Sequence, residues 1–379
     1  MLYGIAAATA ALILAAVLTA LLRTLALRCG VVERRRARVV PLLGGVAVVA
    51  TTALVAGAGD WTGVAPLGPA AGRLLVAGVA VGVLGLFADL LSVVLPLQVP
   101  LRIPLRIPLR IPLRISLQVP LQVAVVAVQV AVAAALTVPY DELGPVVGVV
   151  AAGWIVLVAH AFASLDHADG VMGTVAVLTA FALSGCAAAE IMDGLAALLS
   201  VLAAALTGFL MHNWPPARIV PGRCGALFAG FVLASAAVRV HAGREAGPGM
   251  GAVFALTAVA TADVVLVLVS RRRAGRPLLR GAPDHLVHRL RRLGVTPQGA
   301  AVVVGVTGFA GALVGMLIDL GWLGATAALW VAGGACVAVL ALLRIPAYGV
   351  RRTSADALRI PAKRQVSPHV SAHLRVRNR

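Results

Sequence analysis

Long apolar stretches recur along most of the chain, and short polar segments separate them. Each stretch is close to the roughly 20 residues that an α-helix needs to cross the hydrocarbon core of a bilayer. None shows the two-residue alternation of a membrane β-barrel strand. We therefore predict an all-α, polytopic membrane helix bundle with about eleven transmembrane helices, at residues 2–22, 42–58, 72–91, 121–138, 145–164, 170–188, 194–211, 225–241, 251–269, 298–317 and 325–343.

The composition supports this fold class. Of the 379 residues, 61% are hydrophobic and 12% are charged, and the mean hydropathy is +1.00. A soluble domain of this size does not have so apolar a surface. The four cysteines are scattered without a CxxC pair, so the sequence indicates neither a disulfide framework nor a zinc site.

Basic residues predict the orientation of the chain. The net charge is +18, which in a soluble protein would suggest nucleic acid as a partner. If the N-terminus lies outside, the inner segments hold 29 of the 32 Arg and Lys residues, and only Arg73, Arg239 and Arg244 lie elsewhere. Cytoplasmic loops of membrane proteins collect such charges. We therefore expect a lipid bilayer and no nucleic acid as the partner, with the C-terminus in the cytoplasm.

Composition also divides the chain into a transmembrane domain, residues 1–346, and a basic tail, residues 347–379, that we predict to be disordered. Residues 100–115 read PLRI four times, within a predicted inner loop at residues 92–120. Proline at every fourth position removes backbone donors and blocks an α-helix. The repeat is either a tolerated loop insertion or an interfacial strip whose arginines gather anionic lipid.

Carboxylates at the predicted inner face are the candidates for chemistry. Asp89 and Asp263 lie within or at the ends of apolar runs, where an unpaired charge is costly and usually functional. Either could instead pair with a loop arginine, an alternative that weakens when several carboxylates converge on one face. Carboxylates can hold Mg²⁺, and Arg and His can bind phosphate. Such residues fill five stretches: Glu33–Gly45, Gly85–Leu91, His160–Gly173, Gly208–Phe231 and Asp263–Pro297.

The order and spacing of these stretches resemble the polyprenyl-phosphate N-acetylhexosamine-1-phosphate transferases, the group that contains the MraY and WecA-like enzymes. The resemblance covers nearly the whole chain and includes the eleven-span topology. The form "DHLVHRL" is more similar to the N-acetylglucosamine branch than to the muramyl-pentapeptide branch. The matching positions are Pro41–Gly45, Asp89, Asp166, Asp169, Gly170, Pro216, Ala217, Gly222, Gly225, Asp284, His285, His288 and Arg289.

This resemblance implies a reaction and a set of roles. In the family, polyprenyl phosphate attacks the β-phosphate of a UDP-N-acetylhexosamine with the help of Mg²⁺, which gives a polyprenyl-diphospho-sugar and UMP for cell-wall or surface-polysaccharide synthesis. It implies a bacterial plasma membrane, a cytoplasmic active face, and polyprenyl phosphate, a UDP-sugar and a second copy in a homodimer as candidate partners. Implied catalytic residues are Asp89, Asp166, Asp169, His285 and His288. Implied substrate-binding residues are His160, Asn213, Arg218, Arg223, Asp284 and Arg289.

The residues that depart from the family pattern stand at positions to which the resemblance assigns catalytic, metal-binding or substrate-binding roles. Ala88 stands where the family has the first Asp of a pair, and Arg223 stands where it has the metal-binding Asp of G-D-x-G. His160 and Ala163 replace two asparagines, and Val287 replaces a histidine. An arginine in place of a metal carboxylate repels Mg²⁺ and leaves Asp89 as a weak metal ligand.

Three interpretations follow from these departures. Arg223 could replace the metal as a fixed cation on the diphosphate. Alternatively, the chain is a catalytically impaired pseudoenzyme that binds lipid phosphate or nucleotide, since loss of several catalytic groups together rarely leaves full activity. A lipid transporter is a third interpretation, which the clustering of polar motifs at one membrane face disfavours.

Overall fold

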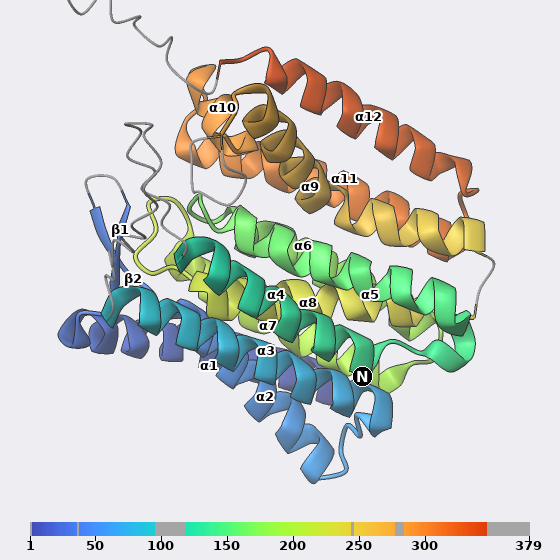
Figure 1. The fold of residues 1–379 in the computed structure, drawn as a ribbon. Coiled ribbons are helices and arrows are strands. Elements are labelled where there is room, and N and C mark those ends of the chain that lie inside the picture. Colours follow the sequence, from blue (N-terminus) through green and yellow to red (C-terminus); the bar gives the residue numbers. More distant parts are fainter. Residues whose placement is uncertain (1, 36–37, 95–117, 244–245, 277–283, 347–379) are drawn as a thin grey trace, which may run out of the picture. The chain divides into compact units, whose positions relative to one another are not determined.

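Helices make up almost all of the computed structural model, which describes the chain apart from residues 1, 36–37, 95–117, 244–245, 277–283 and 347–379 (Figure 1). The helices are α1 (Leu2–Cys29), α2 (Gly44–Trp61), α3 (Gly68–Val94), α4 (Gln118–Thr137), α5 (Tyr140–Leu165), α6 (Val171–Ala189), α7 (Asp193–Asn213), α8 (Gly222–Val240), α9 (Ala246–Arg273), α10 (Leu286–Arg292), α11 (Pro297–Asp319) and α12 (Thr326–Leu343). The two strands are β1 (Val32–Arg35) and β2 (Arg38–Pro41).

The predicted all-α membrane bundle is confirmed. Among the described residues, ten helices are long and apolar enough to cross a membrane, and α4 adds a shorter apolar segment, Val126–Thr137. Each predicted span overlaps one of these helices. The orientation of the termini stays a prediction. Most of the PLRI loop and the whole basic tail lie outside the described residues.

Local chemistry explains where elements differ from the predicted ranges. Helix α5 begins at Tyr140 because a separate first turn precedes a kink at Gly144, next to Pro145. Helix α9 continues beyond its apolar run to Arg271–Arg273, since cations are favourable at a helix C-terminus. The antiparallel β1–β2 hairpin, which pairs Val32 with Pro41, and the short helix α10 were not predicted.

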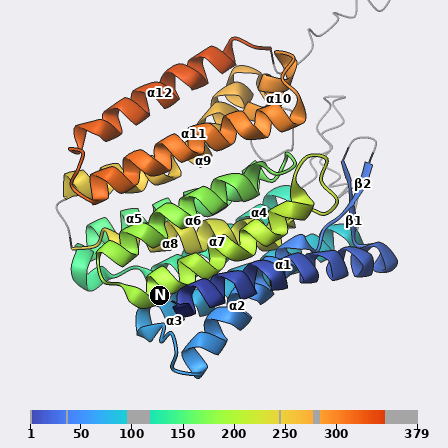
Figure 2. The same cartoon turned by 180° about the vertical axis from the view of Figure 1, so that it is seen from behind.

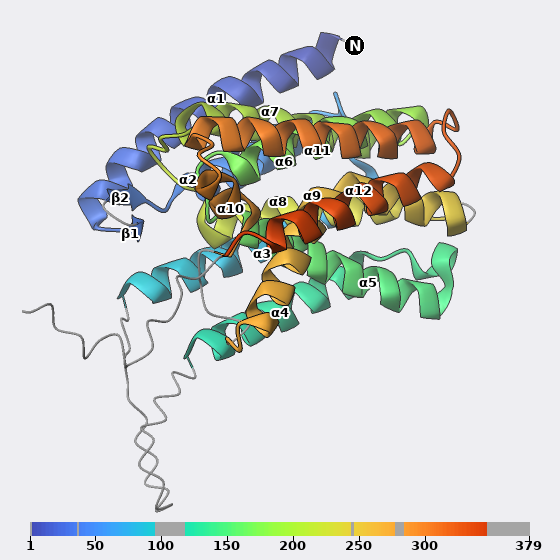
Figure 3. The same ribbon diagram turned by 90° about the horizontal axis from the view of Figure 1, so that it is seen from above.

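Helix α8 is the centre of the bundle. In the 18-residue apolar segment of α8, 89% of the residues are buried. The buried share of the corresponding segment is 17% in α1 and in α12. It packs against α2, α3, α5 and α6, and the view from above shows it between α1 on one side and α4 and α5 on the other (Figure 3). In the view from behind, α7 and α6 pass in front of it (Figure 2). The residues in the first turn of α8 are therefore positioned by neighbouring helices on several sides.

Backbone contacts fix the start of α8 against the entrance to α2. The amides of Gly44 and Gly45 donate to the carbonyls of Val220 (3.0 Å) and Pro221 (3.1 Å). A Cβ atom on Gly45 would overlap the backbone nitrogen of Gly225, so the two helices can approach this closely only because both residues are glycine. The Pro41–Gly45 stretch thus has a packing function.

We predict that Gly45→Ala lowers the free energy of unfolding by roughly 1–3 kcal/mol, because the added methyl group must push α2 away from α8. Thermal unfolding of the purified protein in detergent would measure it. Gly57→Ala is the matched control, since it lies in the same helix and its Cβ would meet nothing within 4 Å. Equal stability of the two variants would contradict the close contact.

Candidate functional site

The ends of seven helices place the predicted site residues at one end of the bundle, on the left in Figure 1. Helices α3, α5, α7 and α9 end there, and α6, α8 and α10 begin there. Asp89 comes from α3, His160 from α5, Asn213 from α7 and Arg223 from α8. Asp166 and Asp169 lie in the α5–α6 loop, Arg218 in the α7–α8 loop, Asp284 and His285 before α10, and His288 and Arg289 within it.

Asp89 and Arg223 form the first group within this site. The Asp89 side chain is buried, and its Oδ2 accepts a hydrogen bond from the backbone nitrogen of Cys224 (3.2 Å). Arg223 attracts the Asp89 carboxylate, and Asp166 is close enough to repel it. Nη1 of Arg223 is buried and has no hydrogen-bond partner among the described residues. A buried guanidinium donor without a partner is costly, and it is suited to an anionic oxygen.

Asp169 and Asn213 connect the two loops beside this group. Asp169 Oδ2 accepts from the backbone nitrogen of Ala217 (3.1 Å) and lies 3.9 Å from Nη2 of Arg38. The Asn213 side chain accepts from the Gly170 amide (3.0 Å) and donates to the carbonyl of Ile219 (2.8 Å). Asp169 and Asn213 therefore hold the α5–α6 loop against the α7–α8 loop.

A second group contains three histidines and one buried carboxylate. Asp263 Oδ2 lies 2.9 Å from Nδ1 of His285, and Asp263 Oδ1 accepts from the Leu286 amide. The His167 ring stacks on that of His285 with centroids 3.7 Å apart, and the His288 ring is 5.0 Å from His167. The carboxylate orients His285 because it accepts from one ring nitrogen, an arrangement that leaves the other nitrogen for a ligand or proton.

His167 is the residue of this group that the sequence analysis missed. Burial, followed by the adjacent His285 imidazole, lowers the pKa of His167 to about 3, so the ring is neutral at neutral pH. Its Nδ1 lies 2.7 Å from the carbonyl oxygen of Ser164, which accepts only, so Nδ1 carries the proton. Nε2 is then a buried acceptor without a partner in the described part of the chain. The sequence feature that could have identified His167 is its position between the candidate residues Asp166 and Asp169.

His167, Asp263 and His285 are also close enough to hold a metal ion, because one donor atom from each lies within 4.8 Å of the others. Imidazole nitrogens with a carboxylate oxygen suit a transition metal such as Zn²⁺ better than Mg²⁺. A metal bound to Nδ1 of His285 would have to displace the hydrogen bond to Asp263.

Arg289 and Asp284 make contacts within the protein. The Arg289 guanidinium donates to the carbonyls of Leu342 (2.7 Å) and Ile345 (2.6 Å) and to Oγ of Ser270. Asp284 forms an ion pair with Arg271 (2.9 Å). These bonds fasten the start of α10 to the ends of α9 and α12.

The two remaining predicted residues differ in exposure. Nδ1 of His160 bonds the carbonyl of Val156 (2.9 Å), and its Nε2 is buried without a partner in the described chain. Arg218 is exposed at the surface of the α7–α8 loop. The substrate-binding role of His160 and Arg218 stays a prediction.

Comparison with known proteins places this site in context. Residues 71–241 match the model for "Glycosyl transferase family 4". The chain is 55% identical to the "Putative glycosyltransferase SCO3672" of Streptomyces coelicolor over 96% of its length and 83% of that protein. It is 30% identical to the decaprenyl-phosphate N-acetylglucosaminephosphotransferase of Mycobacterium tuberculosis (39% of this chain, 42% of the relative). It is 29% identical to the phospho-N-acetylmuramoyl-pentapeptide-transferase of Moorella thermoacetica (43% and 49%).

The low pKa of His167 predicts a loss of stability in acid. Below about pH 6.5 the unfolded chain protonates this histidine, whereas the folded chain does so only near pH 3. The unfolded state therefore binds more protons in this window, and stability falls as pH falls, by at most about 1.4 kcal/mol per pH unit for one group. His167→Gln should make this slope shallower in denaturant unfolding followed by tryptophan fluorescence. An unchanged slope would contradict the assignment.

Proposed function

Because the chain belongs to glycosyl transferase family 4, in the MraY- and WecA-like group, we propose that it transfers N-acetylhexosamine-1-phosphate from a UDP-sugar to polyprenyl phosphate. An oxygen of the lipid phosphate attacks the β-phosphorus of the sugar nucleotide. The bond from that phosphorus to the bridging oxygen breaks, and UMP leaves. The product is a polyprenyl-diphospho-sugar for cell-wall or surface-polysaccharide synthesis.

The observation that carries this proposal is the buried Nη1 of Arg223, beside Asp89, which has no hydrogen-bond partner among the described residues. Two anions must approach each other in this reaction, so a positive group has to offset their charge. Arg223 lies at the first turn of the most buried helix, and its free Nη1 can donate to a phosphate oxygen. We assign it the diphosphate-binding role that the family gives to a metal.

The residues around Arg223 do not fit Mg²⁺. This ion prefers several oxygen ligands in near-octahedral geometry. Here one Asp89 oxygen already accepts from the Cys224 amide, and the guanidinium of Arg223 is close enough to act on the same carboxylate. We therefore derive no step through Mg²⁺ and propose that phosphate binding at this position is independent of the metal.

The histidine group supplies the second part of the proposed site. Asp263 orients His285 through a 2.9 Å hydrogen bond, and neutral His167 stacks on the same ring. A neutral imidazole can accept a proton from a lipid phosphate monoester as its oxygen becomes the nucleophile. We propose His285 as this acceptor and Asp263 as the residue that positions it.

The second candidate function is binding without transfer. Ala88 is buried in the hydrophobic core, where the family has a carboxylate that could hold a metal or take a proton. A protein that has lost this carboxylate and gained Arg223 would still bind phosphate and could serve as a partner of an active relative. In both cases we propose that the chain lies in the bacterial plasma membrane with this site at the cytoplasmic face.

The first test measures UMP release by the full-length protein in liposomes that contain polyprenyl phosphate, after addition of UDP-N-acetylglucosamine. We expect release to persist in EDTA and to fall about 10²- to 10³-fold in Arg223→Gln, since one donor to the reacting phosphates is lost. Arg272→Gln, which changes an exposed arginine at the end of α9, is the control. UMP release that requires Mg²⁺ would contradict the proposal that phosphate binding is independent of the metal. Nucleotide binding without release would favour the second candidate.

The second test restores the family's carboxylates. Ala88→Asp together with Arg223→Asp should create UMP release that depends on Mg²⁺, because two oxygen ligands join Asp89 and a repelling cation is removed. Arg223→Asp alone is the matched control and should respond less. If the double variant folds but stays inactive with Mg²⁺, the site lacks more than these two carboxylates.

A further inference from the structure

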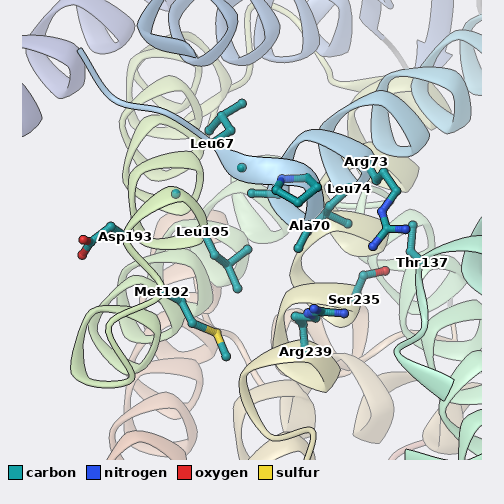
Figure 4. A pocket seen from close by; sticks show the side chains of 14 residues that line it. Leu67, Ala70, Arg73, Leu74, Thr137, Met192, Asp193, Leu195, Ser235 and Arg239 are labelled. Carbon is teal, nitrogen blue, oxygen red and sulfur yellow. The ribbon is translucent and has the colours of Figure 1, made fainter. Parts of the chain in front are cut away.

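A cavity of about 220 Å³ lies at the opposite end of the bundle from the candidate site (Figure 4). It is lined by the starts of α3 and α7 and the ends of α4 and α8. The candidate site uses the other ends of α3, α7 and α8. The cavity is therefore separate from the proposed transfer site by the length of these helices.

One side of the cavity is polar and cationic. Figure 4 shows the guanidinium groups of Arg73 and Arg239 on either side of Ser235. Ser235 is only 6% exposed, and its Oγ has no hydrogen-bond partner among the described residues. A buried hydroxyl without a partner is uncommon in a folded protein. Here it faces a cavity between two cations, which is the environment of a missing anionic acceptor.

Nearby carboxylates do not neutralise this side completely. Asp193 is exposed, and its carboxylate points away from both arginines (Figure 4). Glu142 lies 3.6 Å from Nη2 of Arg239, which is a long contact between partly exposed groups, and such pairs contribute little. Arg73 has no ion pair in the described part of the chain. Both arginines keep donors that can reach a ligand in the cavity.

Most of the rest of the cavity lining is apolar and closely packed. Leu67, Leu74 and Leu195 are buried, and Figure 4 shows Met192 beside Leu195. The Leu67 amide donates to Oδ1 of Asp60 (2.8 Å). A Cβ on Gly194 would overlap the Leu67 carbonyl oxygen, so this glycine allows the wall to pack tightly. A pre-formed cavity with one polar and one apolar side suits an amphiphile.

The sequence makes this cluster of arginines unusual. Only three of the 32 basic residues lie outside the predicted inner segments, and two of them, Arg73 and Arg239, line this cavity. The volume is smaller than the roughly 300–1,000 Å³ of pockets for drug-sized ligands, so it fits a phosphate head group better than a nucleotide.

We propose that this cavity binds the phosphate group of an anionic amphiphile at the membrane surface. Arg73 and Arg239 bind the phosphate oxygens, Ser235 donates its hydroxyl to the same group, and the carbons next to the phosphate pack against Leu67, Leu74, Met192 and Leu195. An anionic lipid head group and a free phosphate ion share this polar chemistry. They differ in whether the apolar wall contributes to affinity.

The test uses the full-length protein in nanodiscs of neutral lipid. Titration calorimetry would measure binding of dihexanoyl phosphatidic acid, inorganic phosphate and, as a head group without net charge, dihexanoyl phosphatidylcholine. We expect phosphatidic acid to bind most tightly and its affinity to fall at least about tenfold in Arg73→Gln, since a hydrogen bond to a charged group is lost. Ser235→Ala and Arg239→Gln should weaken binding as well. Arg28→Gln, an exposed arginine of α1 that does not line the cavity, is the matched control and should bind as the unchanged protein does.

The outcomes separate the two sources of phosphate. Equal affinities for inorganic phosphate and phosphatidic acid, both reduced in Arg73→Gln, would support the phosphate site with a free ion as its ligand. No binding above the phosphatidylcholine control would overturn the proposal. So would unchanged phosphatidic acid affinity in Arg73→Gln, whose exposed side chain can be replaced without disturbing the fold. Because the readout is binding and not transfer, the result is independent of the proposed function.

Discussion

The approach of two backbones at Gly45 and Gly225 is the constraint on which the candidate site depends. It joins the entrance of α2 to the first turn of α8, and hydrogen bonds from Gly44 and Gly45 to the α7–α8 loop reinforce it. Asp89 then reaches the Cys224 amide from α3. The position of Arg223 is therefore set by main-chain packing, because no side chain separates the two glycines. The Arg223 side chain therefore extends from a fixed backbone position beside Asp89.

The two groups of the site differ in their charge. Arg223 supplies a cation at the start of α8, beside Asp89 of α3, whereas burial and the adjacent His285 imidazole keep His167 neutral. Neutral imidazoles can exchange protons but cannot offset the charge of a diphosphate. In the proposed function that task falls to Arg223, which lies beside Asp89 and whose Nη1 has no hydrogen-bond partner among the described residues. The link between the groups is the α5–α6 loop, which carries Asp166 and His167 side by side and is fixed by Asp169 and Asn213.

Much of the fold could be predicted because a bilayer imposes a simple rule on sequence. A spanning helix must be apolar over its whole length, so hydropathy alone located the long helices. It could not locate α10, which has only seven residues, or the β1–β2 hairpin, whose strands have only four residues each and include three arginines. The kink before Pro145 also shifted the start of α5, since the turn ahead of it contains Asp141 and Glu142. Short polar elements are stabilised by their neighbours, and a single sequence does not show those neighbours.

The sequence by itself determined the helical membrane class, the likeness to one transferase family, and the presence of Ala88 and Arg223 at positions where the resemblance leads us to expect carboxylates. These are properties of composition, order and residue identity, which do not depend on packing. Only the tertiary structure decided that Arg289 donates to Leu342 and Ile345 within the protein, and that His167 joins His285 and Asp263. Only it brought Arg73, Ser235 and Arg239 to one cavity. The physical reason is that these contacts join residues on different helices, and a hydropathy pattern carries no information about which helices become neighbours.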